Sequence, residues 1–186
     1  SPTNQAAAIT TTTTTNNIAS TSSATTAAGA SRIAALQTHI QTMTNKGINV
    51  EHRMLPIGDA LWVARPKKKS NNNIATATGT ATGPTQQQQQ REWVLDYVLE
   101  RKSLADLVGS ITGGRYESQC YVLRRCGLDT RFYLVEGEVD RMAKPTDQKM
   151  IRTKCAEMDV EGDFKLLCTI NHQDTFRLYD RLTTAI

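Results

Sequence analysis

Apolar residues recur along the chain with two different spacings, which predict both helices and strands. One set has helical spacing and ends at Gly47, a residue typical of helix termini. Its members are Ile33, Leu36, Ile40 and Met43. Extended apolar runs predict three strands, at residues 48–55, 61–65 and 93–100. The last run has apolar side chains on both faces, so we expect a central strand that is covered on both sides.

The second half of the sequence alternates helical and extended patterns. Ser103 is typical of a helix N-cap, with Asp106 three residues later, and Gly113-Gly114 ends that helix. Further helices are predicted at 115–126, at 145–159 and from 174 onward, and strands at 131–136 and 164–170. Extended runs that pair locally and then alternate with helices predict an α/β fold, with a mixed central sheet flanked by helices on both faces.

Two stretches of low complexity interrupt this pattern. Residues 1–30 contain no charged side chain, and such a segment cannot bury enough apolar surface to order itself, so we expect it to be disordered. The second stretch, 67–91, includes an uncharged tract from 70 to 90. It is expected to be an insertion in the loop of a β-hairpin, because long surface insertions cost little closure entropy. The folded domain is therefore assigned to residues 31–186.

Composition narrows the possible functions only slightly. The formal net charge of +4 is compatible with binding to nucleic acid without being diagnostic of it. No apolar run approaches the roughly 20 residues of a membrane span, so no membrane partner is expected. The four cysteines lack C-x-x-C spacing and the three histidines complete no zinc pattern, which favours free thiols in a reducing compartment. Because the chain has no initiator Met, we interpret it as part of a longer protein.

Charged residues at the end of the predicted central strand suggest a chemistry. Glu100, Arg101 and Lys102 are consecutive there, and Asp59 follows Gly58 in a turn upstream. Two carboxylates can hold a hard cation such as Mg2+, while a lysine can orient water or offset charge on phosphorus. Taken alone, Asp59 is a common turn residue and Asp106 a common capping residue. Together they indicate a divalent-metal phosphodiesterase and make nuclease chemistry the first hypothesis.

These residues also resemble a known signature. Gly58-Asp59, followed by E-R-K-x-x-x-D at 100–106, resembles the motif of the XPF-type structure-specific endonucleases. Within that family, segments 58–62, 114–119 and 123–128 are most similar to the catalytic Mus subunits of Mus/Eme crossover-junction endonucleases. The resemblance covers roughly residues 31–186. It implies a restriction-endonuclease-like fold, Mg2+ (or Mn2+) as cofactor, and a heterodimer with a non-catalytic Eme-like partner subunit. The implied activity is cleavage of branched DNA (3′ flaps, forks and nicked Holliday junctions) in DNA repair and recombination, in the nucleus.

The resemblance further implies roles for single residues. Asp59 and Glu100 would be metal ligands, and Lys102 would position the water or stabilise the transition state. Arg101 would hold the carboxylates or a phosphate, and Asp106 would orient Lys102 or Arg101. Three arginines of the following helix are candidate DNA contacts, with an exposed helical face as the alternative; they are Arg115, Arg124 and Arg125. Glu136 is interpreted as a possible support of the site, with a solvated strand end as the favoured alternative.

One feature departs from the family pattern. In the family an earlier strand contributes another Asp and a nearby Glu, but residues 1–30 contain neither. We therefore expect this chain to lack the first strand of the sheet and to be inactive as an isolated fragment. The alternative function is a non-catalytic scaffold or DNA-binding subunit of the same fold in a nuclease heterodimer. Such subunits tend to lose the E-R-K set, which this chain keeps.

Overall fold

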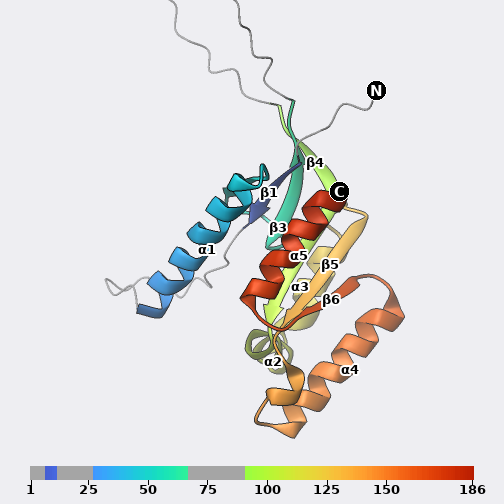
Figure 1. Ribbon diagram of the computed structural model, residues 1–186. Coiled ribbons are helices and arrows are strands. Elements are labelled where there is room, and N and C mark those ends of the chain that lie inside the picture. The colour runs from blue at the N-terminus through green and yellow to red at the C-terminus, as the bar shows by residue number, and fades with distance from the viewer. Residues whose placement is uncertain (1–6, 12–26, 67–90) are drawn as a thin grey trace, which may run out of the picture.

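The computed structural model describes residues 7–11, 27–66 and 91–186 (Figure 1). Its strands are β1 (Ala7–Thr11), β2 (Asn49–His52), β3 (Ala60–Ala64), β4 (Trp93–Ser103), β5 (Thr130–Glu136) and β6 (Lys165–Thr169). Its helices are α1 (Ala27–Asn45), α2 (Leu104–Thr112), α3 (Arg115–Arg124), α4 (Pro145–Glu161) and α5 (His172–Ala185), with a short 3-10 turn at Val139–Arg141. From α1 onward these bounds confirm the predicted order of elements, although α5 begins two residues earlier than expected because Asn171 caps it.

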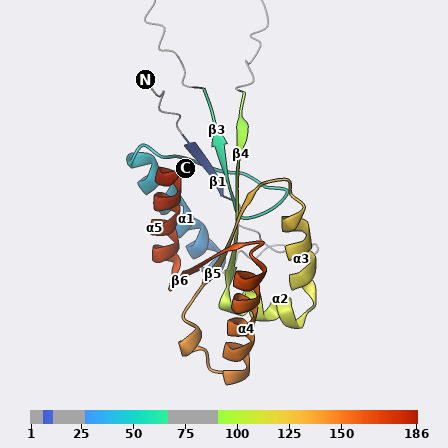
Figure 2. The same ribbon diagram turned by 90° about the vertical axis from the view of Figure 1, so that its right-hand side faces the viewer.

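The strands form one mixed sheet in the order β2-β1-β3-β4-β5-β6. β3 and β4 pair in an antiparallel hairpin, whereas β4, β5 and β6 run parallel to one another. Figure 2 shows α1 and α5 on one side of the sheet and α2, α3 and α4 on the other. The predicted fold class, a mixed central sheet flanked by helices, is therefore confirmed.

Each face of the sheet has its own apolar core, and β4 contributes to both. Val98 packs toward α2, α3 and α4, while its neighbour Leu99 packs toward α1 and α5, and neither is exposed to solvent. The expectation of a strand covered on both sides holds for this half of β4. It is wrong for the other end, where Trp93 and Val94 are half-exposed. Trp62 of β3 lies wholly inside the second core and donates its indole N–H to Thr183 of α5, which satisfies its polar atom.

The N-terminal stretch differs from the expectation. β1 lies between β2 and β3, parallel to the first and antiparallel to the second, so the expectation of a sheet without its first strand is wrong. The predicted disorder of 1–30 is also wrong for residues 7–11 and 27–30, which are β1 and the start of α1. The rest of that segment, 1–6 and 12–26, and most of the insertion, 67–90, lie outside the described residues. β1 has the sequence Ala-Ala-Ile-Thr-Thr, so it brings no carboxylate to the sheet.

The ends of the β3–β4 hairpin lie at opposite edges of the sheet. Ala64 pairs with Trp93 at the end that leads into the insertion, and Ala60 pairs with Leu99 at the other end. The insertion therefore begins after the end of β3 that lies away from Glu100. Ala64, at that end, is about 15 Å along the strand from the level of Glu100.

All four cysteines are free thiols, as predicted. None of the helices in the described part of the chain is both long and apolar enough to cross a membrane.

Candidate active site

A tight turn places Asp59 against β4. Gly58 has a positive φ of 70°, and a Cβ at this position would lie 2.5 Å from Val98 Cγ2 and 3.1 Å from the Leu99 carbonyl oxygen. Only glycine accepts both that backbone conformation and that close approach. The Asp59 amide donates to the Leu99 carbonyl at 2.7 Å, and Asp59 Oδ2 accepts from the Arg101 amide at 2.7 Å. The Asp59 carboxylate is thus fixed beside the last residues of β4.

Glu100 and Lys102 complete a three-residue cluster at this end of β4. They are two residues apart on one strand, so their side chains share a face of the sheet. Lys102 Nζ lies 3.0 Å from Glu100 Oε1, and the two side chains are only 13% and 14% exposed. Because Ala60 pairs with Leu99, Asp59 lies at the level of Glu100. The structure therefore brings Asp59, Glu100 and Lys102 to the same end of β4. Figure 1 shows that this end of the strand leads into α2.

The donor atoms of this cluster fit a hard divalent cation. The carboxylates of Asp59 and Glu100 offer oxygen only, and Mg2+ is usually held by one or two carboxylates together with several waters. Within the ranges 7–11, 27–66 and 91–186, no group of three or more His, Cys, Asp or Glu side chains could hold a metal ion. The pair Asp59–Glu100 is accordingly the candidate for metal binding, and β1 adds no further ligand to it.

Arg101 lies on the opposite face from Glu100 and Lys102. Its Nε and one terminal nitrogen donate to the two oxygens of Glu136 at 2.7 and 2.6 Å, a bidentate ion pair. Arg101 was expected to hold the site carboxylates or a phosphate with its guanidinium. In the structure its backbone amide binds Asp59, and its guanidinium binds Glu136 instead of a site carboxylate. Arg101 faces away from Glu100 and Lys102 because successive side chains along a strand point to opposite faces of the sheet.

Glu136 is buried, so its interpretation as a solvated strand end is wrong. It is 7% exposed, since it ends β5 between β4 and β6 and α5 covers it. Burial acts to raise the pKa of Glu136, but hydrogen bonds from Arg101 and Thr175 and the charge of Arg101 outweigh it and hold the pKa below its ordinary value. The carboxylate is therefore charged at neutral pH. Thr175, which donates to it at 2.7 Å, was not found by sequence reasoning because it lies 39 residues away on another element.

Asp106 caps α2. The Ser103 hydroxyl accepts from the Asp106 amide at 3.1 Å and donates to its carboxylate at 2.8 Å. The positive N-terminal end of the helix dipole also stabilises an acidic side chain at this position. Asp106 thus takes part in the cap of α2 as expected, although its carboxylate binds the Ser103 hydroxyl. Its predicted role in orienting Lys102 or Arg101 has no support among these contacts, because both hydrogen bonds of the exposed Asp106 go to Ser103.

The three arginines of the following helix differ in their surroundings. Arg115 is exposed at the first position of α3, directly after Gly114. Arg125 is also exposed and lies over the ring of Tyr121. Arg124 is bound to Glu161 at 2.8 Å and to Asp163 at 2.7 Å, which joins the end of α3 to the end of α4. The structure thus leaves Arg115 and Arg125 available to a phosphate and gives Arg124 a structural ion pair.

The mixed sheet flanked by helices has the restriction-endonuclease-like fold. The solved structure of XPF from Aeropyrum pernix has this fold, with a TM-score of 0.56 and 15% identity over 96% of this chain and 64% of that one. The match to the ERCC4 domain extends over residues 30–182. The chain therefore belongs to the ERCC4 domain family, and the predicted membership of the XPF-type endonucleases is confirmed.

Curated relatives show which members of the ERCC4 domain family this chain is similar to. The chain is 34% identical to the crossover junction endonuclease MUS81 of Oryza sativa subsp. japonica, over 75% of its length. It is 33% identical to crossover junction endonuclease mus81 of Aspergillus fumigatus over 76% of its length, and 38% identical to human structure-specific endonuclease subunit MUS81 over 53%. The chain spans only about a fifth of these relatives, 18%, 23% and 16% of their lengths respectively.

Proposed function

We propose that this chain is the nuclease domain of a structure-specific endonuclease that hydrolyses phosphodiester bonds in branched DNA during repair and recombination. The substrates would be 3′ flaps, forks and nicked Holliday junctions. The observation that carries the proposal is the cluster of Asp59, Glu100 and Lys102 at one end of β4. The relatives are named crossover junction or structure-specific endonucleases, and another solved structure of the same fold is XPF from Aeropyrum pernix in complex with DNA.

Each residue of the cluster has a part in this chemistry. Asp59 and Glu100 would hold Mg2+ (or Mn2+), which when bound supplies a Lewis acid for the phosphoryl oxygen. The Arg101 amide fixes the Asp59 carboxylate, so this ligand is ordered before the substrate arrives. Lys102 carries a fixed positive charge in a site largely removed from solvent, where it can orient the attacking water or stabilise the charge that develops on phosphorus. Arg115 and Arg125 are proposed as phosphate contacts.

A partner subunit completes the proposal. We propose a heterodimer with a non-catalytic Eme-like subunit acting in the nucleus. We expect the 186-residue chain alone to be inactive, because β1 brings no carboxylate where the family resemblance implies an Asp and a nearby Glu. The alternative is a scaffold or DNA-binding subunit of the same fold. The presence of Glu100, Arg101 and Lys102 together, with Glu100 and Lys102 in contact, favours the enzyme.

Cleavage of matched substrates tests this function. The full-length protein with its partner, in Mg2+ or Mn2+, is expected to cut a 3′ flap or a nicked junction at least about tenfold faster than a linear duplex of the same sequence, because branch shape and deformability replace base contacts as the source of specificity. The measurement is the initial rate on end-labelled DNA. Equal rates on both substrates would contradict structure specificity, and no cutting of either would favour the scaffold alternative.

A further inference from the structure

A buried polar network lies behind the site, on the face of the sheet covered by α5. Thr175 Oγ1 donates to Glu136 Oε2 at 2.7 Å and lies 2.7 Å from Thr169 Oγ1. Glu136 in turn receives two hydrogen bonds from the Arg101 guanidinium, and His172 Nδ1 lies 2.5 Å from Glu136 Oε1 and 3.2 Å from the same guanidinium. The network thus joins β4, β5, β6 and α5, and Thr175, Thr169 and Glu136 are all buried.

Arg101 connects this network to the candidate metal ligands. Its backbone amide binds Asp59 Oδ2, and the residues on either side of it in β4 are Glu100 and Lys102. Its guanidinium is held by Glu136 on the other face. Asp59 is a second carboxylate whose negative charge acts on the same guanidinium. Arg101 is therefore held at both ends, its backbone amide by Asp59 and its guanidinium by Glu136.

The charge of Arg101 needs a counter-ion, because the side chain is only 26% exposed and a partly buried guanidinium that loses its partner carries a desolvation penalty. Without the Glu136 carboxylate, Asp59 is the remaining acid already in electrostatic contact with Arg101. A guanidinium that turned toward Asp59 would bind the oxygens that a divalent cation needs. Arginine and carboxylate form strong bidentate pairs, so this competition would lower the affinity of the site for metal.

We propose that Glu136 and Thr175 are positioning residues of the nuclease site, which keep the Arg101 guanidinium on the α5 face and away from the carboxylates of Asp59 and Glu100 that would hold the metal. This inference depends on the proposed function of that cluster. Glu136 acts as the counter-ion of Arg101, and Thr175 fixes the orientation of Glu136 through its hydroxyl. Removing a residue that orients metal ligands without touching the metal typically lowers metal affinity or activity about 10- to 100-fold.

The Mg2+ dependence of cleavage separates this role from a merely structural one. In the full-length protein with its partner, Glu136→Gln is expected to raise the Mg2+ concentration at half-maximal rate about tenfold or more. Thr175→Val removes the hydrogen bond to the charged Glu136 carboxylate and the one to Thr169, and the expected rise is roughly fivefold. Thr175→Ser keeps the hydroxyl and is expected to restore the wild-type Mg2+ dependence. The KM for DNA is expected to change less than twofold in all three variants, because none of these side chains faces the substrate.

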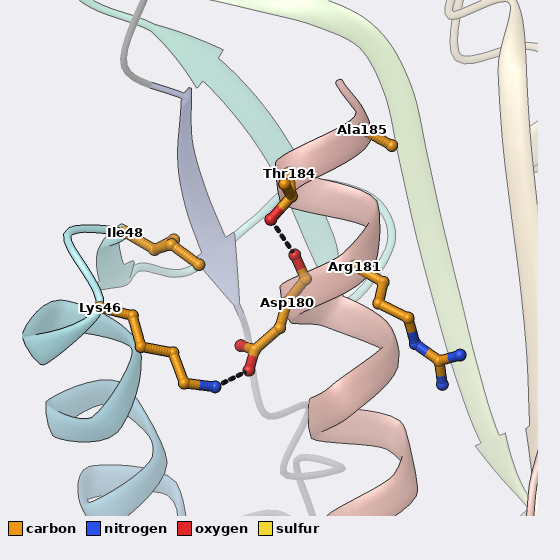
Figure 3. A pocket seen from close by; sticks show the side chains of 6 residues that line it. All are labelled: Lys46, Ile48, Asp180, Arg181, Thr184 and Ala185. Carbon is orange, nitrogen blue, oxygen red and sulfur yellow. Dashed lines mark hydrogen bonds and ion pairs between the residues drawn. The ribbon is translucent and has the colours of Figure 1, made fainter.

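Two variants of the same helix serve as controls. Thr183→Val removes the buried hydrogen bond to Trp62, two helical turns from Thr175. Asp180→Asn breaks the ion pair with Lys46 that joins α5 to α1 (Figure 3). Both weaken the packing of α5 without touching Arg101. They are expected to lower the Tm as much as Thr175→Val does while leaving the Mg2+ dependence unchanged.

The outcomes distinguish this inference from the proposed function. Wild-type Mg2+ dependence in both Glu136→Gln and Thr175→Val would overturn the positioning role, as would an equal shift in Thr183→Val. If Glu136→Gln does not fold, Thr175→Val compared with Thr175→Ser decides the question alone. Lys102→Ala is measured in parallel: if it cuts at the wild-type rate, the proposed function itself is wrong. If Lys102→Ala is inactive and the Mg2+ dependence of both network variants is unchanged, only the positioning role fails.

Discussion

Glu100→Gln is expected to lower the rate of flap cleavage by the full-length complex about 1,000-fold or more, with DNA affinity near that of the wild type. The substitution keeps the shape of the side chain and removes its negative charge. The site then loses one of its two candidate metal ligands, and Lys102 loses its ion-pair partner at 3.0 Å. Loss of one electrostatic group at such a site typically costs 100- to 1,000-fold, and loss of a metal ligand also removes Lewis-acid stabilisation.

A glutamate on another element provides the control for this substitution. Glu157 of α4 is paired with Lys154 at 2.7 Å, so Glu157→Gln also breaks a Glu–Lys ion pair, but far from β4 in the sequence and on a solvent-exposed helix face. Its cleavage rate is expected to stay within twofold of the wild type. The measurements are single-turnover cleavage rates together with DNA binding in Ca2+. A Glu100→Gln rate within tenfold of the control would exclude Glu100 as a metal ligand.

Gly58→Ala is expected to destabilise the domain by about 3 kcal/mol and to reduce cleavage at the same time. A left-handed conformation costs a residue with a Cβ about 1–2 kcal/mol, and overpacking a buried site costs about 1–3 kcal/mol more. The new methyl group would meet Val98 Cγ2 and the Leu99 carbonyl oxygen, and Val98 has no exposed surface into which it could move. The turn would have to shift away from β4, and Asp59 would shift with it.

Gly47 supplies a matched control, because it also has a positive φ, 81°, but a Cβ there meets nothing within 4 Å. Gly47→Ala is therefore expected to cost only about 1 kcal/mol, from the backbone alone, with an unchanged cleavage rate per folded molecule. Denaturant unfolding of both variants measures the difference. Equal destabilisation at the two positions would show that the close approach of Gly58 to β4 is not required.

The sequence predicts the central part of this fold well because its signals are local. β4, α2 and the glycine break before α3 follow from strand alternation, the Ser103 cap and Gly113-Gly114. The cluster of Asp59, Glu100 and Lys102 was equally predictable, although 41 residues separate Asp59 from Glu100, since β3 and β4 form a hairpin that brings the two segments together whatever the length of the insertion.

Features that depend on distant partners could not be predicted in the same way. β1 consists of alanine, isoleucine and threonine within a uniform polar tract, so no apolar spacing marks it, and only its pairing with β2 and β3 defines it. The opposite directions of the Lys102 and Arg101 side chains follow from strand alternation, but the partner of Arg101 does not. Glu136 and Thr175 meet Arg101 only through the register of β4 with β5 and the position of α5 over them. The ion pairs of Arg124 likewise join residues 37 and 39 positions apart.

The central claim is that Asp59 and Glu100 jointly bind a divalent cation at the end of β4, and Mn2+ binding tests it most directly. Crystals of the protein soaked in Mn2+ and measured at the manganese absorption edge are expected to show an anomalous peak within about 2–2.6 Å of oxygen atoms of both carboxylates, the range of such metal–oxygen contacts. The peak is expected to be lost in Glu100→Gln and kept in Glu157→Gln. Manganese bound elsewhere, or a peak that persists in Glu100→Gln, would contradict the account.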